Sequence, residues 1–243
     1  TDTTGKRSDF MRDAMREISR ARNHHLKRRD SLWDGRPFGD TVLLKREAIE
    51  RKLLYTWLNP VKAGLVRRAE DWPGFKILPR HWGKTLRVKR PDFYYGRQTP
   101  EYIEFTPMPP PGFDEMGLEQ VREHFEKLLK EAEDELHKSR AKKKVKGALK
   151  VCQLDPFSCP KTPSPLRDFS PRFACKDGET LRSAMQRYKD FLDEYQRQRH
   201  KWMKGKKVEF PCGTVQLRRR SPIRCKPPSS DEPGLFLLTR AVG

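Results

Sequence analysis

A helix with a proline near its end, within residues 51–66, constrains this chain more than any other segment. Its sequence is Arg-Lys-Leu-Leu-Tyr-Thr-Trp-Leu-Asn-Pro-Val-Lys-Ala-Gly-Leu-Val. Proline has no N–H and disfavours a helical conformation of its predecessor, so Asn59-Pro60 predicts that the helix stops there. At 100° per residue, and apart from Glu50, one side of this helix is apolar. The apolar arc contains Leu53, Leu54, Trp57 and Leu58.

Tyr55 falls on the opposite side of this helix, near Arg51, Lys52 and Asn59. A tyrosine among cations, one turn before a helix end, is placed to meet an anion. The alternative is that Tyr55 packs against another element, since tyrosine is commonly half-buried. Taken alone, the residue pattern favours packing.

Two blocks of sequence carry a resemblance to a known family. The block over residues 55–66, followed by Asp71-Trp72-Pro73, resembles the signature of the REP-associated tyrosine transposases. These belong with the single-tyrosine insertion-sequence transposases of the HUH class. The similarity covers residues 8–75, about a third of the chain, and weakly touches residues 180–220.

The resemblance implies that Tyr55, four residues before the Asn-Pro pair, is the catalytic nucleophile. In that family the tyrosine forms a covalent 5′-phosphotyrosine link and frees a 3′-hydroxyl. Family members use Mg or Mn, held by two histidines that are separated by one hydrophobic residue. None of the six histidines here forms such a pair, and adjacent His24 and His25 fit a surface turn better than a ligand set. We therefore expect no metal or other cofactor in this fragment and no strand cleavage by the chain alone.

The formal charge of +20 favours a polyanionic partner, and nucleic acid is the usual one. Candidate DNA-binding residues on the tyrosine helix are Arg51, Lys52, Asn59 and Lys62. A second group lies at and after the end of the first predicted helix and comprises Arg22, Lys27, Arg28, Arg29 and Arg36. The alternative for the second group is a solvated surface, with cations favourably placed at a helix C-terminus.

Two functions remain open. The first is the C-terminal part of a DNA transposase that acts on single-stranded or hairpin DNA, inactive as a fragment, with a homodimer allowed by the family. The second is a non-catalytic, basic nucleic-acid-binding protein derived from a transposase. An odd number of cysteines, five, without a Cys-x-x-Cys pair indicates reduced thiols, as in a bacterial cytoplasm, where the nucleoid holds the DNA. No run of about 18 apolar residues occurs, so no membrane partner is expected.

The predicted fold class is α+β and mainly helical, a partial HUH-type domain in which helices lie on one face of a sheet. The resemblance places most of that sheet upstream of Thr1, where it is either missing from the chain or lost. Apolar spacing predicts helices near residues 8–23, 45–58, 116–137 and 179–203. In the first helix the predicted apolar face holds Phe10, Met11, Ala14, Met15, Ile18 and Ala21, with Ser8 as the cap. Short strands are expected at residues 40–44 and, as a hairpin, at residues 208–210 and 215–217.

Composition divides the chain into six predicted segments. Residues 1–82 form the transposase part, 83–115 a linker rich in proline and aromatic residues, and 116–150 an amphipathic helix with a basic tail. Residues 151–178 form an irregular linker, 179–226 a helix with a basic hairpin, and 227–243 a tail. The basic, proline-rich extension after residue 82 is expected to contact DNA or to lie solvated on the surface.

Overall fold

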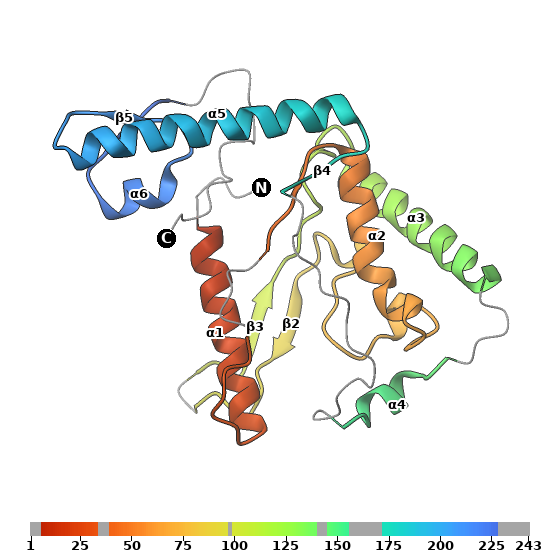
Figure 1. Cartoon of the computed structure of the whole chain (residues 1–243). Coiled ribbons are helices and arrows are strands. Elements are labelled where there is room, and N and C mark those ends of the chain that lie inside the picture. The colour runs from red at the N-terminus through yellow and green to blue at the C-terminus, as the bar shows by residue number, and fades with distance from the viewer. Residues whose placement is uncertain (1–5, 34–38, 97–98, 140–144, 156–171, 228–243) are drawn as a thin grey trace. The chain divides into compact units, whose positions relative to one another are not determined.

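Helices are the main elements of this protein (Figure 1). The computed structural model describes residues 6–33, 39–96, 99–139, 145–155 and 172–227. These form two compact units: Lys45–Phe169, and Thr1–Leu44 together with Ser170–Gly243. Mixed helices and small sheets agree with the predicted α+β, mainly helical class. The predicted segment 1–82 contains parts of both units.

The unit of Lys45–Phe169 is built around two packed helices. Its α-helices are α2 (Arg46–Lys62), α3 (Leu118–Ser139) and α4 (Ala148–Cys152). Its other elements are the 3-10 helices η1 (Ala69–Asp71) and η2 (Pro79–His81) and the strands β2 (Leu86–Lys89) and β3 (Tyr102–Phe105). Phe125 of α3 is fully buried at the centre of the core. The rings of Trp57, Trp82 and Phe113 meet it edge-on at centroid distances of 6.0, 5.2 and 5.1 Å.

The predicted stop of the tyrosine helix at Asn59-Pro60 is wrong, because α2 continues through Pro60 to Lys62. In the last turn, proline removes one N–H and interrupts little of the helix. The chain then turns at Gly64, whose φ of +70° suits a residue without Cβ. Leu65 N–H donates to Pro60 O at 3.0 Å and Gly64 N–H to Val61 O at 2.9 Å. This pair of bonds is a Schellman motif, which satisfies the last carbonyl groups of α2.

The predicted linker 83–115 contains an antiparallel hairpin that was not expected from the sequence. Strand β2 pairs with β3 in the register Leu86↔Phe105 to Lys89↔Tyr102. Beyond it, Phe113 is buried in the core. Arg46 holds this segment at the start of α2: its guanidinium donates to Gly112 O at 2.9 and 2.7 Å and lies 4.5 Å from the Phe113 ring centroid.

Within its described residues, the second unit contains two long helices and four very short strands. Its elements are α1 (Arg7–His25), β1 (Val42–Leu43), β4 (Phe173–Ala174), α5 (Gly178–Met203), β5 (Glu209–Phe210), α6 (Val215–Arg220) and β6 (Arg224–Cys225). The strand expected at residues 40–44 is confirmed as β1, which pairs in parallel with β4. The hairpin expected at residues 208–217 is wrong. Strand β5 pairs in parallel with β6, and its expected partner begins α6, where Leu-Arg-Arg-Arg favours a helix over a strand.

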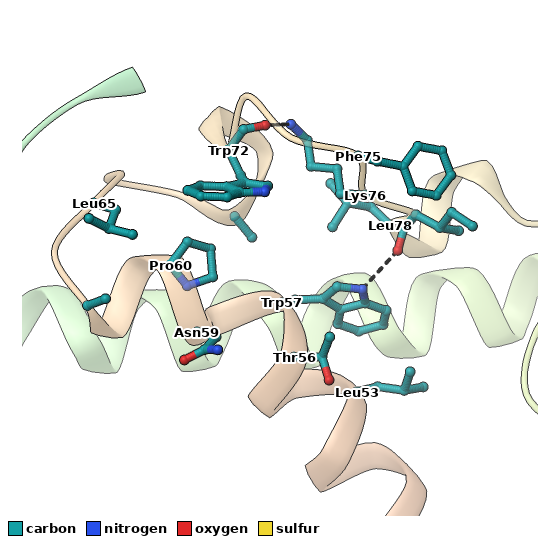
Figure 2. Close-up of a pocket in the computed structure, with 13 residues that line it drawn as sticks. Leu53, Thr56, Trp57, Asn59, Pro60, Leu65, Trp72, Phe75, Lys76 and Leu78 are labelled. Atoms are coloured by element: carbon teal, nitrogen blue, oxygen red, sulfur yellow. Dashed lines mark hydrogen bonds between the residues drawn. The ribbon is translucent and has the colours of Figure 1, made fainter. Parts of the chain in front are cut away.

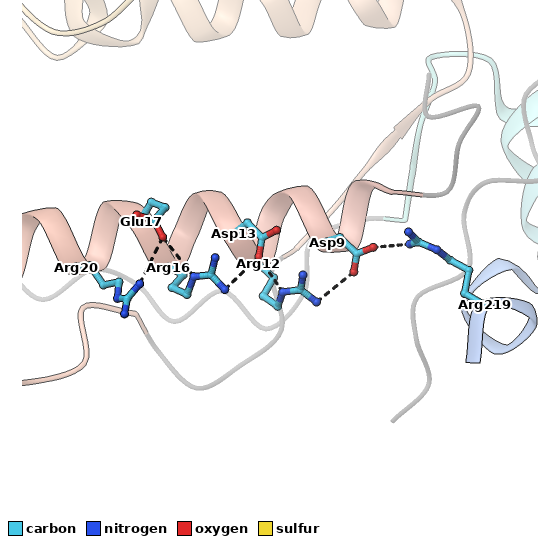
Figure 3. Close-up of polar contacts among 7 residues, drawn as sticks. All are labelled: Asp9, Arg12, Asp13, Arg16, Glu17, Arg20 and Arg219. Atoms are coloured by element: carbon cyan, nitrogen blue, oxygen red, sulfur yellow. Dashed lines mark hydrogen bonds and ion pairs between the residues drawn. The ribbon is translucent and has the colours of Figure 1, made fainter. Parts of the chain in front are cut away.

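Helix α1 matches its predicted range but not its predicted packing. It buries no residue, and Phe10 and Ile18 of the expected apolar face are 68% and 53% exposed. Ser8 lies inside the helix, whose N-cap is Lys6 without a side-chain cap. A ladder of ion pairs follows the helix surface (Figure 3). It joins Arg12 to Asp9 and Asp13, Arg16 to Asp13 and Glu17, and Arg20 to Glu17.

Parts of three predicted segments lie outside the described residues. These are residues 140–144 of the basic tail that follows the predicted helix, residues 156–171 of the irregular linker, and residues 228–243 at the end of the chain. The described part after α3 is docked by its backbone. Lys146 and Gly147 donate their N–H groups to Gly64 O and Leu65 O, both at 2.9 Å. The segment therefore pairs with the turn that ends α2.

Candidate nucleic-acid interface

Tyr55 lies on the solvent face of α2, whereas the residue pattern alone favoured packing against another element. Half of its surface is exposed. The ammonium groups of Lys52 and Lys62 lie 5.8 and 5.6 Å from its ring centroid. Cations at this distance are attracted to the face of an aromatic ring. The phenol is thus presented on a rigid helix between two positive charges.

Arg51 and Asn59 flank Tyr55 one turn away on either side. Residues four apart share a helix face, so both project beside the phenol. Both side chains are exposed, and the Asn59 carboxamide makes no hydrogen bond with any residue that the structure describes. We call this row the α2 stripe: Arg51, Lys52, Tyr55, Asn59 and Lys62. Four of the predicted DNA-binding residues are therefore brought together around the predicted nucleophile.

The second predicted group lies in the other unit, at the end of α1. Arg22, Lys27 and Arg29 are exposed, whereas Arg28 is half-buried with its guanidinium 3.9 Å from the Asp30 carboxylate. Arg36 lies outside the described residues. Lys27 adopts a left-handed φ of +51°, which is uncommon for a side chain with Cβ. This group belongs to the other unit and is described by itself.

A pocket of about 570 Å³ lies next to the α2 stripe, between α2 and residues 65–78 (Figure 2). Its walls are mainly apolar and include Leu53, Pro60, Leu65, Trp72 and Phe75, with Asn59, Thr56 and Lys76 as polar members. Figure 2 shows the Trp72 indole facing the Pro60 ring. At one wall, Trp57 Nε1 donates to Ile77 O at 2.8 Å. Asn59 belongs to both the pocket and the stripe.

The two sequence blocks of the transposase resemblance meet at this pocket. Asn59 and Pro60 come from the first block, and Trp72 comes from the second. Asp71 fixes the second block by accepting the Arg68 N–H at 3.0 Å, which closes η1. The blocks are separate in sequence but form one structural feature.

Gly74 and Glu133 position the pocket and were not identified from the sequence. A Cβ at Gly74 would lie 2.5 Å from Trp72 Nε1, so glycine allows the indole its position. Glu133 of α3 accepts the Ala69 N–H at 2.7 Å and anchors η1 to α3. Burial raises the pKa of Glu133, an effect that the bond from Ala69 opposes. The Pro-Gly pair that follows Trp72 in the sequence indicates a turn, and it was the available signal that the backbone at Gly74 comes close to the Trp72 indole.

Three histidines of this unit have structural partners. His124 Nε2 lies 2.8 Å from Glu50 Oε1, which accounts for the glutamate that interrupts the apolar arc of α2. His137 Nε2 lies 2.8 Å from Arg67 O. His81 Nδ1 accepts the Leu78 N–H at 3.0 Å, and burial lowers the pKa of His81.

The described residues do not fit the metal that the resemblance implies. Among them, no three His, Cys, Asp or Glu side chains come together in a group that suits a metal ion. The charged members of the α2 stripe are cations, which repel a metal ion instead of binding it.

A scan against protein-family models and searches of curated proteins and of solved structures give no match. No helix among the described residues combines the length and apolar character that crossing a membrane requires.

Proposed function

We propose that this chain binds single-stranded or hairpin DNA through the α2 stripe. We also propose that Tyr55 is the residue that attacks the phosphodiester in the intact enzyme of the family it resembles. The observation that carries the proposal is the exposed Tyr55 between the ammonium groups of Lys52 and Lys62. Ammonium groups on both sides of the phenol can bind phosphates of a strand, and a helix aims the phenol.

The proposed step is a transesterification. The Tyr55 phenol oxygen forms a bond to phosphorus, and the bond from phosphorus to the 3′ oxygen breaks. The phenol proton is lost to solvent, and the departing 3′ oxygen takes up a proton. One phosphodiester replaces another, so rejoining the strand needs no external energy source. A phenol has a pKa near 10 and is a weak nucleophile, so the step requires activation of the phosphate that the described residues do not supply.

The second candidate is a non-catalytic nucleic-acid-binding protein. The structural partners of His81, His124 and His137, together with the cationic surroundings of Tyr55, favour it for this chain by itself. Both candidates share the α2 stripe as the DNA-binding surface, and they differ in whether Tyr55 becomes covalently bound.

A covalent-adduct assay on hairpin DNA with Mg²⁺ or Mn²⁺ tests whether Tyr55 of this chain becomes covalently bound. We expect no adduct from the chain alone, and we expect hairpin binding that survives Tyr55→Phe. The matched control is Tyr102→Phe, since Tyr102 is also partly exposed, with the Arg87 guanidinium 4.1 Å from its ring centroid. An adduct formed by the parent and the control but not by Tyr55→Phe would establish the nucleophile and reject the non-catalytic candidate.

Binding itself is tested by Lys52→Ala combined with Lys62→Ala. We expect this pair to weaken hairpin binding. The control pair Lys127→Ala and Lys130→Ala removes the same charge from exposed positions of α3 in the same unit. Equal losses from both pairs would show that net charge alone, and not the α2 stripe, is responsible.

A further inference from the structure

We infer that the pocket beside the α2 stripe receives an unpaired nucleobase of the bound strand. The inference rests on the proposed function and specifies its ligand: a strand with at least one base free of pairing. The α2 stripe holds the phosphates, and the pocket takes the base.

The walls of the pocket suit the face of a base. Trp72 and Phe75 supply aromatic surface, and Pro60 lies opposite the Trp72 indole (Figure 2). Flipped or unpaired bases are commonly held between aromatic and apolar side chains. A volume of about 570 Å³ lies within the range of roughly 300–1,000 Å³ that small-molecule sites occupy.

The polar groups of the pocket suit the edge of a base. Asn59 offers a carboxamide, with both a donor and an acceptor, at the boundary between pocket and stripe. Asparagine commonly pairs with base edges through these two groups. Lys76 belongs to the pocket wall, where its ammonium donates to Trp72 O.

Charge complementarity selects a nucleotide over an uncharged apolar ligand. Lys52 lies four residues before Thr56, a member of the pocket wall, so the two share a helix face and a positive charge lies beside the apolar pocket. A nucleotide has the same arrangement, with a flat base on one side of the sugar and an anionic phosphate on the other. The stripe and the pocket are adjacent on one helix, so a single nucleotide can engage both.

Two probes of equal charge test the inference: an oligothymidylate of about 12 nucleotides and an abasic strand of the same length. This length lies within the site sizes of roughly 4–16 nucleotides found for proteins that bind single strands. Stacking contributes about 1–3 kcal/mol per base, so we expect the parent chain to prefer the thymidylate by roughly 5- to 150-fold. Trp72→Ala should remove this preference. Ala63→Phe should also remove it, because it fills the pocket from an exposed position and leaves the core intact.

The control pair is Lys52→Ala with Lys62→Ala, which should weaken both probes equally and keep the preference. Equal binding of the two probes by the parent chain would overturn the nucleobase pocket and leave the proposed DNA binding in place. A preference that survives both Trp72→Ala and Ala63→Phe would overturn the pocket in the same way. Failure of the parent chain to bind either probe would overturn the proposed function and the pocket together.

Discussion

Helices α1 and α2 carry similar basic sequences but differ in how their charges are used. On α1, Arg12, Arg16 and Arg20 each pair with an acid on the same helix. On α2, Arg51, Lys52 and Lys62 form no ion pair with any residue within the described ranges, and two of them face Tyr55. Cations that are already paired have less to gain from a phosphate. We therefore propose α2 and not α1 as the binding helix, although charge counts alone would favour either helix.

The two helices also differ in the number of residues that they bury. Helix α2 buries Ala48, Trp57, Leu58 and Val61, whereas α1 buries no residue. A surface that presents a reactive side chain needs a rigid support, and only α2 has one.

The largest expected effect is on the core beneath α2. Trp57→Ala should lower the free energy of unfolding by about 3–5 kcal/mol, because Trp57 contacts Phe125 and Trp82 and bonds to Ile77 O. The matched change in α1, Met15→Ala, should cost well under half as much, since Met15 is only half-buried. Urea titration of the full chain measures both. Equal losses of unfolding free energy in the two variants would contradict the difference in packing between α1 and α2.

The ends of the two helices provide the next comparison. Gly64→Ala should destabilise the protein by about 1–2 kcal/mol, because a Cβ is unfavourable at a φ of +70°. The control Gly117→Ala places its Cβ at least 3.7 Å from its nearest neighbour and should be close to neutral. A Gly64→Ala variant as stable as the parent would contradict the motif at the end of α2.

Helix α1 ends in the same motif with lysine in place of glycine. Arg28 N–H donates to Asn23 O at 2.9 Å and Lys27 N–H to His24 O at 3.3 Å, around the left-handed Lys27. Lys27→Gly should therefore raise the free energy of unfolding by about 0.5–1 kcal/mol. Lys27→Ala, which keeps Cβ, should give no such gain in the same titration. A loss of stability in Lys27→Gly would show that α1 does not end in this conformation.

A smaller effect should appear as a pH dependence of the stability of the unit of Lys45–Phe169. Burial lowers the folded-state pKa of His81 below its ordinary value of about 6.5. The folded state then binds fewer protons than the unfolded state, so the contribution of His81 is complete above pH 6.5 and is lost as pH falls through the folded pKa. His81→Asn retains an acceptor for the Leu78 N–H but does not titrate, so its stability should fall less between pH 7 and pH 5.5. Identical pH profiles for the parent and His81→Asn would contradict this role.

Helices were the most predictable part of the fold. Residues 116–137 and 179–203 were expected as helices and are observed as Leu118–Ser139 and Gly178–Met203. Apolar spacing also placed Tyr55 opposite the apolar arc of its helix, because that position depends only on helix geometry.

Features that depend on compensating hydrogen bonds or on contacts distant in sequence were not predictable. Pro60 remains helical because Gly64 and Leu65 satisfy the end of α2, a compensation that proline propensity ignores. The two-residue parallel bridges of β1 and β5 are set by tertiary packing and leave almost no local pattern. Likewise, the pocket requires Trp72 to face Pro60, and no periodicity connects these two residues.

The salt dependence of hairpin-DNA affinity tests the central claim, that the α2 stripe binds phosphates, most directly. Each phosphate contact contributes about 0.7–0.9 to the slope of log affinity against log salt concentration. Lys52→Ala with Lys62→Ala should therefore reduce the slope by about 1.4–1.8, whereas Arg12→Ala with Arg16→Ala on α1 should leave it nearly unchanged. A slope that is the same in the parent and the α2 variant, or that falls only in the α1 variant, would contradict the claim.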